Sequence, residues 1–95
     1  MPSHQLATDY HELERFANEL ERFCDSLEYD TKKLQNETDY VTESAWKGQQ
    51  ASEFQAVIAQ NGELIQKDVR ELRELVDKIR ESAKLLRDAR ERKIS

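Results

Sequence analysis

Helix-breaking residues are almost absent from this chain, and their scarcity constrains its fold more than any other feature. The 95 residues include two glycines and one proline. The proline is Pro2, so only Gly48 and Gly62 can interrupt a helix in the body of the chain. Gly48 lies near the midpoint, two residues after Trp46, between two long stretches of periodic apolar residues. This arrangement predicts that Trp46-Lys47-Gly48 forms the turn of a helical hairpin.

Leucine recurs at every seventh position in the first half of the chain, from Leu6 to Leu34, and Val41 continues the series. Four positions after each of these residues, the side chain is mostly small or polar. A two-position heptad of this kind is typical of a long helix that packs along a seam, the row of residues where two helices meet. We predict a helix over about residues 8–40, capped by Thr8 or Asp9. The small or polar positions are Ala17, Cys24, Thr31, Thr38 and Ala45.

Apolar residues in the second half recur at spacings of three or four. This is one unbroken helical phase, and we predict a turn at about 41–48 followed by a helix over about 49–91. Asn61-Gly62 is a turn signal by itself, but the phase continues past it. We therefore expect Gly62 to be a point of close packing on the seam, with a kinked helix as the alternative. The stripe comprises Ala51, Phe54, Ile58, Gly62, Ile65, Val69, Leu72, Val76, Ile79, Ala83 and Leu86.

The expected fold is all-α, an antiparallel two-helix hairpin that spans residues 1–95 as one domain. A hairpin buries one seam and leaves apolar edges exposed, so we expect a second chain to cover them. Small chains without disulfides or metal sites commonly gain stability in this way. Two hairpins would form an elongated four-helix bundle. The residues expected to pack the hairpin and dimer seams are Leu13, Leu20, Leu27, Leu34, Phe54, Ile58, Ile65, Leu72, Val76 and Ile79.

The net charge of −5 is unevenly distributed along the chain. Residues 1–30 carry two basic and eight acidic residues, a net charge of −6, whereas residues 78–95 carry seven basic and three acidic residues, a net charge of +4. An antiparallel hairpin would bring these segments together, so we interpret the asymmetry as intramolecular complementarity. The basic segment contains acids and lacks aromatic residues, which argues against nucleic-acid binding. Neither helix has a basic face, so membrane binding is not supported.

Residues for catalysis or metal binding do not converge in this sequence. His4 and His11 are the only histidines, and no H-x-x-x-H or E-x-x-H spacing places two ligands on one helix face. No glycine-rich loop is present to hold a phosphate. We expect no enzyme activity, no metal, no cofactor and no small-molecule substrate. Cys24 is the one cysteine, which excludes an intrachain disulfide, and we expect it to pack as a small core residue.

Targeting signals are also missing. No stretch approaches the ~18 consecutive apolar residues of a membrane span. Residues 1–6 lack the basic and apolar segments of a cleavable signal peptide. We expect that any export of this protein uses a route that does not require such a peptide.

The central segment from Ser44 to Phe54 has the sequence SAWKGQQASEF. Small Ala51 follows the W-x-G motif, and Phe54 stands eight positions after Trp46. With a length near one hundred and an amphipathic helix on each flank, the chain resembles the WXG100 family, the ESAT-6-like proteins of type VII (ESX) secretion. The resemblance covers essentially the whole chain.

The resemblance implies a small helical-hairpin protein that is cytoplasmic before export and is secreted by a type VII system without a cleavable signal peptide. It implies a dimer with itself or with a WXG100-like or effector chain, recognition by the export ATPase, and a role as substrate or targeting partner. Trp46 and Gly48 would then form both the turn and part of an export motif. The simpler interpretation is that they only close the turn, with Trp46 covering the end of the seam near Phe54 and Val57.

One departure from the family pattern concerns the export signal. Many members, or their partners, carry a Y-x-x-x-D/E sequence after the second helix, but residues 85–95 contain no tyrosine. Tyr10 and Glu14 have the spacing in the first half of the chain, where we interpret Tyr10 as a packing residue. Two possibilities stay open: a homodimer with a relaxed signal, or a partner that supplies the signal.

Two other functions remain as alternatives at this stage. The chain could be an accessory chaperone that pairs with the helical targeting domain of a larger secreted toxin. It could instead be a cytoplasmic coiled-coil adaptor with no link to secretion.

Overall fold

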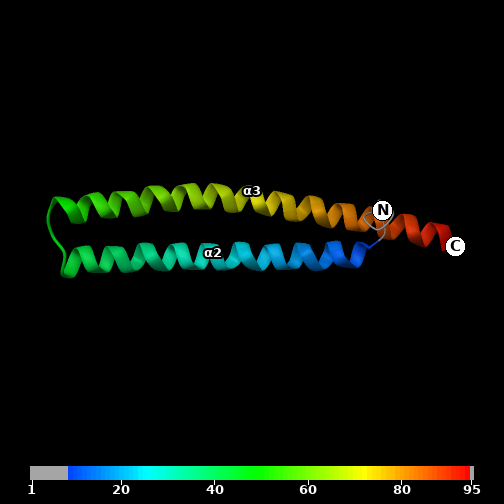
Figure 1. Cartoon of the computed structure of the whole chain (residues 1–95), viewed down its shortest axis with the longest axis horizontal. Coiled ribbons are helices and arrows are strands. Elements are labelled where there is room, and N and C mark those ends of the chain that lie inside the picture. Colours follow the sequence, from blue (N-terminus) through cyan, green and yellow to red (C-terminus); the bar gives the residue numbers. More distant parts are fainter. Residues whose placement is uncertain (1–8, 95) are drawn as a thin grey trace, which may run out of the picture. The chain divides into compact units, whose positions relative to one another are not determined.

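The computed structural model describes residues 9–94 of the chain and consists there of two helices, α2 and α3 (Figure 1). Helix α2 spans Tyr10–Ser44 and helix α3 spans Gln49–Ile94. The described residues contain no strand, so the predicted all-α class and the hairpin are confirmed. The predicted heptad leucine at residue 6 and the alternative cap at residue 8 lie outside the described residues.

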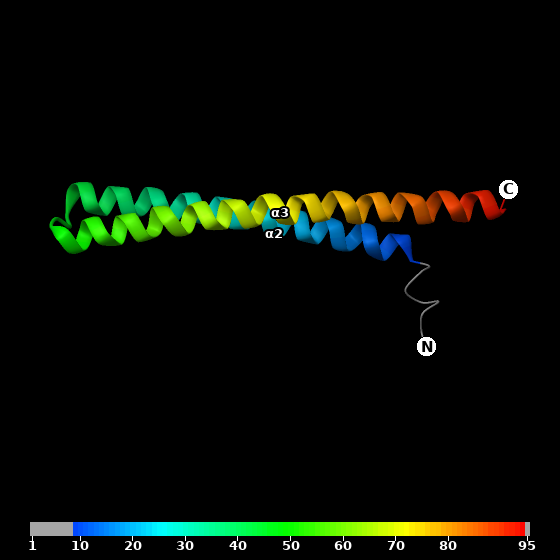
Figure 2. The same cartoon turned by 90° about the horizontal axis from the view of Figure 1, so that it is seen from above.

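Two compact units make up the chain. The turn unit comprises residues 24–71, and the terminal unit comprises residues 9–23 together with 72–94. Within each unit, a segment of α2 lies beside a segment of α3, as the two views in Figure 1 and Figure 2 agree. The turn between the helices belongs to the turn unit.

Helix α2 begins at a capped end. The Asp9 carboxylate accepts a hydrogen bond from the backbone N–H of Glu12 at 3.1 Å, and the Asp9 carbonyl accepts one from the N–H of Leu13 at 3.4 Å. Asp9 therefore satisfies one of the N–H groups that a helix leaves unpaired at its start.

The end of α2 differs from the sequence prediction. The helix ends at Ser44, about four residues beyond the predicted end near residue 40, so the turn is shorter than the predicted 41–48. Residues 41–44 contain no glycine or proline, and two of their hydroxyl groups donate back to carbonyls of the preceding helical turn. Thr42 Oγ1 donates to the carbonyl of Thr38 at 2.9 Å, and Ser44 Oγ donates to the carbonyl of Tyr40 at 2.6 Å.

Helix α3 runs through Asn61-Gly62 without interruption. Gly62 is buried, and a β-carbon at this position would overlap the side-chain amide of Gln35 and lie 3.6 Å from the methyl group of Thr31. Both neighbours belong to α2, so the absence of a side chain on Gly62 lets the helices of the turn unit approach each other. The predicted close-packing role of Gly62 is confirmed.

The most deeply buried side chains of the turn unit are small. Cys24, Ala51 and Val69 are almost fully buried, and Thr38 is 5% exposed. The Thr38 hydroxyl donates to the carbonyl of Leu34 at 2.8 Å, so its polar group has a partner within its own helix. Small residues at the centre of the seam allow two backbones to pack closely, as the small second heptad positions of α2 predict. The burial of Cys24 also agrees with its predicted core position.

The terminal unit has a similar small core. Ala17, Val76 and Ala83 are the buried apolar residues among its described positions, and each is at most 2% exposed. Leu13, Leu20, Leu72 and Ile79 are half-buried beside them.

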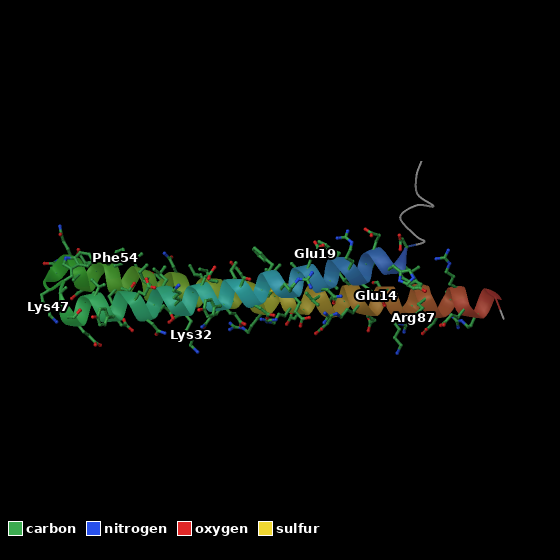
Figure 3. All side chains as sticks on the ribbon, turned by 90° about the horizontal axis from the view of Figure 1, so that it is seen from below. Glu14, Glu19, Lys32, Lys47, Phe54 and Arg87 are labelled. Atoms are coloured by element: carbon green, nitrogen blue, oxygen red, sulfur yellow. The ribbon has the colours of Figure 1, made fainter. Side chains whose placement is uncertain are left out.

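Arginine side chains of α3 cross to acidic and polar side chains of α2 in the terminal unit. Arg80 donates to the Glu21 carboxylate at 2.6 Å and to the Asn18 side chain at 3.0 Å. Arg87 lies 3.6 Å from the Glu14 carboxylate, and Figure 3 shows these two side chains on neighbouring helices. The partner numbers fall on α2 as they rise on α3, so the segments are antiparallel, and the predicted charge complementarity is present in these pairs.

Candidate interaction surface at the helical turn

The polypeptide reverses direction within a few residues after Ser44. The carbonyl of Val41 accepts hydrogen bonds from the N–H groups of Ala45 at 2.9 Å and Trp46 at 2.8 Å. The Lys47 ammonium donates to the carbonyl of Glu43, and a cation at a helix C-terminus is also favoured by the helix dipole. These bonds satisfy carbonyl groups that the end of α2 would otherwise leave unpaired.

Gly48 supplies the backbone geometry of the turn. Its φ of 107° lies in a region that side-chain-bearing residues rarely adopt. The Gly48 carbonyl then accepts a hydrogen bond from the N–H of Ser52 at 3.2 Å, so α3 starts directly after it. A β-carbon on Gly48 would meet no atom within 4 Å, so the requirement for glycine here comes from the backbone alone.

Trp46 packs against Phe54 from the first turns of α3. The ring centroids are 5.5 Å apart and the ring planes are tilted by 52°, a favourable arrangement for two aromatic rings. Trp46 remains 37% exposed and Phe54 43% exposed. Figure 3 shows Phe54 and Lys47 at the same end of the turn unit. The aromatic pair therefore contributes a partly open apolar surface as well as a contact between the helices.

A shallow apolar depression lies beside this pair. We call it the Trp46 groove; its volume is about 220 Å³. Leu34 and Val41 project into it from α2 and are about half exposed, opposite Phe54 from α3. The predicted end of α2 near residue 40 placed Val41 in the turn, although the heptad period already extended to this position. The groove is lined by Leu34, Glu37, Thr38, Val41, Thr42, Trp46 and Phe54.

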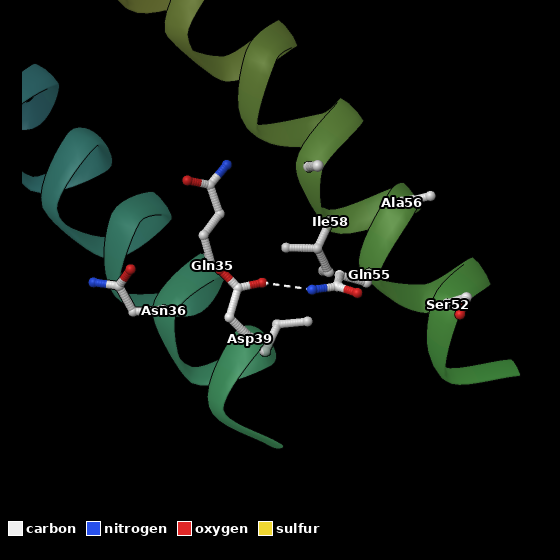
Figure 4. A pocket seen from close by; sticks show the side chains of 9 residues that line it. Gln35, Asn36, Asp39, Ser52, Gln55, Ala56 and Ile58 are labelled. Atoms are coloured by element: carbon white, nitrogen blue, oxygen red, sulfur yellow. Dashed lines mark hydrogen bonds between the residues drawn. The ribbon is translucent and has the colours of Figure 1, made fainter. Parts of the chain in front are cut away.

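A second depression in the turn unit is lined by both polar and apolar side chains. It has a volume of about 560 Å³ and includes the side chains of Gln35, Asn36 and Ser52. Figure 4 shows Gln55 reaching across this cleft to Asp39, and its amide nitrogen donates to the carboxylate at 2.8 Å. The turn unit thus has an apolar groove at Trp46 and a separate cleft where the two helices are joined by hydrogen-bonding side chains.

The seam residues predicted from sequence differ in their burial. Val76 is fully buried, most of the others are half-buried, and Leu34 and Phe54 are exposed at the Trp46 groove. The deepest positions are the smaller residues between the leucines, such as Ala17 and Cys24. The half-buried members are Leu13, Leu20, Leu27, Ile58, Ile65, Leu72 and Ile79.

Groups that could hold a metal ion are absent from the part of the chain that the structure describes, which has no cluster of three or more His, Cys, Asp or Glu residues. The Nδ1 atom of His11 lies 3.9 Å from the Glu14 carboxylate, and the His11 ring contacts the ring of Tyr10 in a tilted arrangement. His4 lies outside the described residues. Neither described helix contains a segment long and apolar enough to cross a membrane.

Two antiparallel helices joined at a W-x-G turn, with apolar side chains left open beside it, define a helical-hairpin protein. A family model, WXG100 (proteins of 100 residues with WXG), matches residues 5–90. The chain belongs to the WXG100 family. No curated protein and no solved structure matches the chain significantly.

Membership places the chain among the small helical proteins of ESX-like secretion systems. The family is non-enzymatic. Its members generally form homodimers or heterodimers.

Proposed function

We propose that this protein is a secreted substrate or targeting partner of a type VII secretion system and acts through protein–protein contacts. It leaves the cytoplasm folded, as a dimer with itself or with another helical hairpin. The observation that carries the proposal is the turn. Gly48 provides the reversal, while Trp46 and Phe54 present a partly exposed aromatic surface beside it.

Exposed apolar residues support a role in binding. Leu34, Val41 and Phe54 are each more than 40% exposed, and together with Trp46 they form a contiguous groove. Contiguous apolar surface on a small protein marks an interaction site more often than scattered single residues do. A helical partner would cover these side chains and add to the small apolar core of the hairpin.

Secretion is tested by comparing the culture medium of strains with and without the export ATPase. The protein is expected in the medium only when the ATPase is present. Retention in the cytosol of both strains would exclude the proposed function and favour a cytoplasmic adaptor. Light scattering of the purified chain, alone and with the product of a neighbouring gene, would then separate a homodimer from an accessory chaperone of a larger toxin.

Recognition by the export machinery is separated from folding with conservative variants. Trp46→Phe keeps an aromatic ring against Phe54, and Phe54→Leu is a matched apolar change on the facing helix. If Trp46 is recognised directly, Trp46→Phe abolishes export while its Tm stays close to that of the parent, and Phe54→Leu is still exported. If Trp46 only closes the turn, export falls in proportion to the loss of Tm in both variants.

A further inference from the structure

Two exposed tyrosines line a shallow depression on α2. The depression has a volume of about 350 Å³, and all of its lining residues belong to this helix. Tyr29 is 68% exposed and Tyr40 is 71% exposed, more than any other large apolar side chain that the structure describes. Tyrosine is enriched at interfaces because its ring is apolar while its hydroxyl group can stay hydrated. We call this surface the tyrosine strip; it consists of Tyr29, Lys32, Lys33, Asn36, Glu37 and Tyr40.

The tyrosine strip faces away from α3. Tyr29 follows buried Cys24 by five positions, and Tyr40 follows buried Thr38 by two. At 3.6 residues per turn, each tyrosine therefore lies about 140–160° around the helix from the buried side. The residues along the centre of the strip are spaced four, three and four apart, which is the spacing of a helix-packing seam. They are Tyr29, Lys33, Asn36 and Tyr40.

The lining residues of the strip are arranged symmetrically along the sequence. They form pairs that are equidistant from a point between residues 34 and 35: Tyr29 with Tyr40, Lys32 with Glu37, and Lys33 with Asn36. A two-fold axis at that point would place each residue level with the other member of its pair on an antiparallel second copy. Tyr29 would then meet Tyr40 at both ends of the contact, and aromatic rings pack favourably in such pairs. A two-fold interface between identical chains requires a self-complementary patch of this kind.

The charges of the strip also suit an antiparallel second copy. Lys33 and Glu37 are four positions apart, so they lie on the same side of the helix. In the antiparallel pair, Lys33 of each copy comes beside Glu37 of the other, which gives two contacts between opposite charges. Parallel pairing would instead bring Lys33 beside Lys33 and Glu37 beside Glu37. Contacts between like charges select against that arrangement.

Acidic residues confine the contact to the length of the strip. Asp25 and Glu43 lie four and three positions beyond the tyrosines, and antiparallel pairing would bring them near each other. They therefore end the contact at Tyr29 and Tyr40 and keep it weak. The lining residues themselves carry two lysines and one glutamate. A partner of mixed charge fits this strip better than nucleic acid or an anionic membrane, because both of these select a strongly basic surface.

We propose that two copies of this chain associate through the tyrosine strip, antiparallel to each other and related by a two-fold axis between residues 34 and 35. The Trp46 groove is lined from both helices, whereas the strip belongs to α2 alone. A hairpin that is paired at the groove keeps Tyr29, Lys33 and Tyr40 open, since none of them lines the groove. The strip would then link dimers into larger assemblies. This inference goes beyond the proposed function, which requires only a dimer.

Cysteine cross-linking tests the pairing and its direction. In a Cys24→Ala background, which removes the one native cysteine, one chain carries Tyr29→Cys and the other carries Tyr40→Cys. These positions are about 16 Å apart along one helix, too far for a disulfide within a chain. We expect oxidation of the mixture to give disulfide-linked pairs several times faster than oxidation of either chain alone. A Lys67→Cys chain, changed at an exposed position of α3 outside the strip, is the matched control and should link no faster with the Tyr29→Cys chain than by itself.

Charge exchange assigns the contact to Lys33 and Glu37. Lys33→Glu or Glu37→Lys, introduced into both cysteine chains, should slow cross-linking of the mixture about tenfold at low salt, because two attractive pairs become repulsive. The double variant restores both pairs in exchanged order and should return the rate to within about twofold of the parent. The two single changes shift the net charge in opposite directions, so a loss shared by both cannot come from net charge. Lys33 does not line the Trp46 groove, and circular dichroism should show that all variants remain helical.

The inference is overturned by equal linking in the mixture and in the separate chains, or by faster linking of a single chain with itself, which indicates parallel pairing. A double charge variant that links as slowly as the single variants also overturns it. The export experiment is independent of these measurements. An exported chain whose mixture does not cross-link contradicts this inference alone, whereas a chain that cross-links through the strip but is never exported contradicts the proposed function alone.

Discussion

The turn unit and the terminal unit use different interactions to hold α2 against α3. In the turn unit, the helices approach closely at Gly62, and Gln55 donates a hydrogen bond to Asp39, sixteen residues away in sequence. In the terminal unit, Arg80 forms an ion pair with Glu21, a contact that joins residues 59 apart.

The two sets of contacts also differ in their distance from the turn along the chain. Closing a longer loop costs more conformational entropy, although the increase is slow. Gln55 and Asp39 close a short loop beside the turn, whereas the ion pair of Arg80 with Glu21 joins the basic and acidic segments at the two ends of the sequence. Two segments with the same heptad pattern can thus depend on different forces.

The largest expected effects test whether each unit has its own core. Val69 in the turn unit and Val76 in the terminal unit are 1% and 2% exposed, so Val69→Ala and Val76→Ala are matched changes. Each is expected to lower the free energy of unfolding by about 2 kcal/mol, measured by chemical denaturation. Amide hydrogen exchange should show the greater loss of protection in the unit that carries the change. Equal loss throughout both units would mean that the chain unfolds as a single cooperative structure.

The two glycines provide a second comparison, because they are required for different reasons. Gly48→Ala is expected to cost about 1–2 kcal/mol, since alanine is strained at a φ of 107° although its β-carbon has open space. Gly48→Asn should be less destabilising, because asparagine tolerates positive φ better.

Replacing Gly62 with alanine removes the glycine, which is a poor helix former. The added β-carbon, however, displaces the flexible side chain of Gln35. These effects oppose each other, so the stability of Gly62→Ala should lie within about 1 kcal/mol of the parent by thermal unfolding. A larger loss than that of Gly48→Ala would show that the close approach of the helices, and not the turn, is the tighter constraint.

The hairpin itself was predictable because helical periodicity is a property of sequence alone. The spacings of three or four that continue through Gly62 predicted an unbroken α3, and the position of Trp46 and Gly48 predicted the turn. The end of α2 was placed too early: residues 41–44 contain no glycine or proline, and the helix continues through them to Ser44. Helix boundaries are less well defined by periodicity than the existence of the helix is.

The candidate surface was less predictable than the fold. A stripe of apolar residues identifies one face of a helix, but it does not distinguish residues covered by the other helix from residues left for a second chain. Leu34 and Phe54 have the same periodicity as half-buried Leu27 and Ile58, yet they line the open groove. Distinguishing them required the rotation of each helix about its axis, which depends on packing in three dimensions.

The ion pairs offer a smaller effect that separates the units by salt dependence. Arg80→Met keeps an unbranched apolar side chain but removes the pair with Glu21, and should cost about 0.5–1 kcal/mol at low salt, because both groups are partly exposed. Most of this loss of stability should disappear near ~1 M salt, where charges are screened within about 3 Å. Gln55→Met in the turn unit removes an uncharged hydrogen-bond donor. The loss in the free energy of unfolding that it causes should therefore change less with salt. If both variants respond equally to salt, the proposed contrast between the units is wrong.

The smallest effect concerns the start of α2, where Arg15 bridges Glu12 and Glu19. The hydrogen bond from Arg15, supported by its positive charge, lowers the pKa of Glu12 below its usual value of 4.5. A lowered pKa in the folded state means that this interaction contributes stability above pH 4.5 and that the contribution is lost as the pH falls below that value.

Carboxyl-carbon NMR should detect the lowered pKa of Glu12, and Arg15→Gln should return it toward 4.5. In the parent, the helicity of the first turns of α2 should fall as the pH is lowered below 4.5. In Arg15→Gln, this fall in helicity should be smaller. A titration of Glu12 that is the same with and without Arg15 would show that this bridge is not formed in solution.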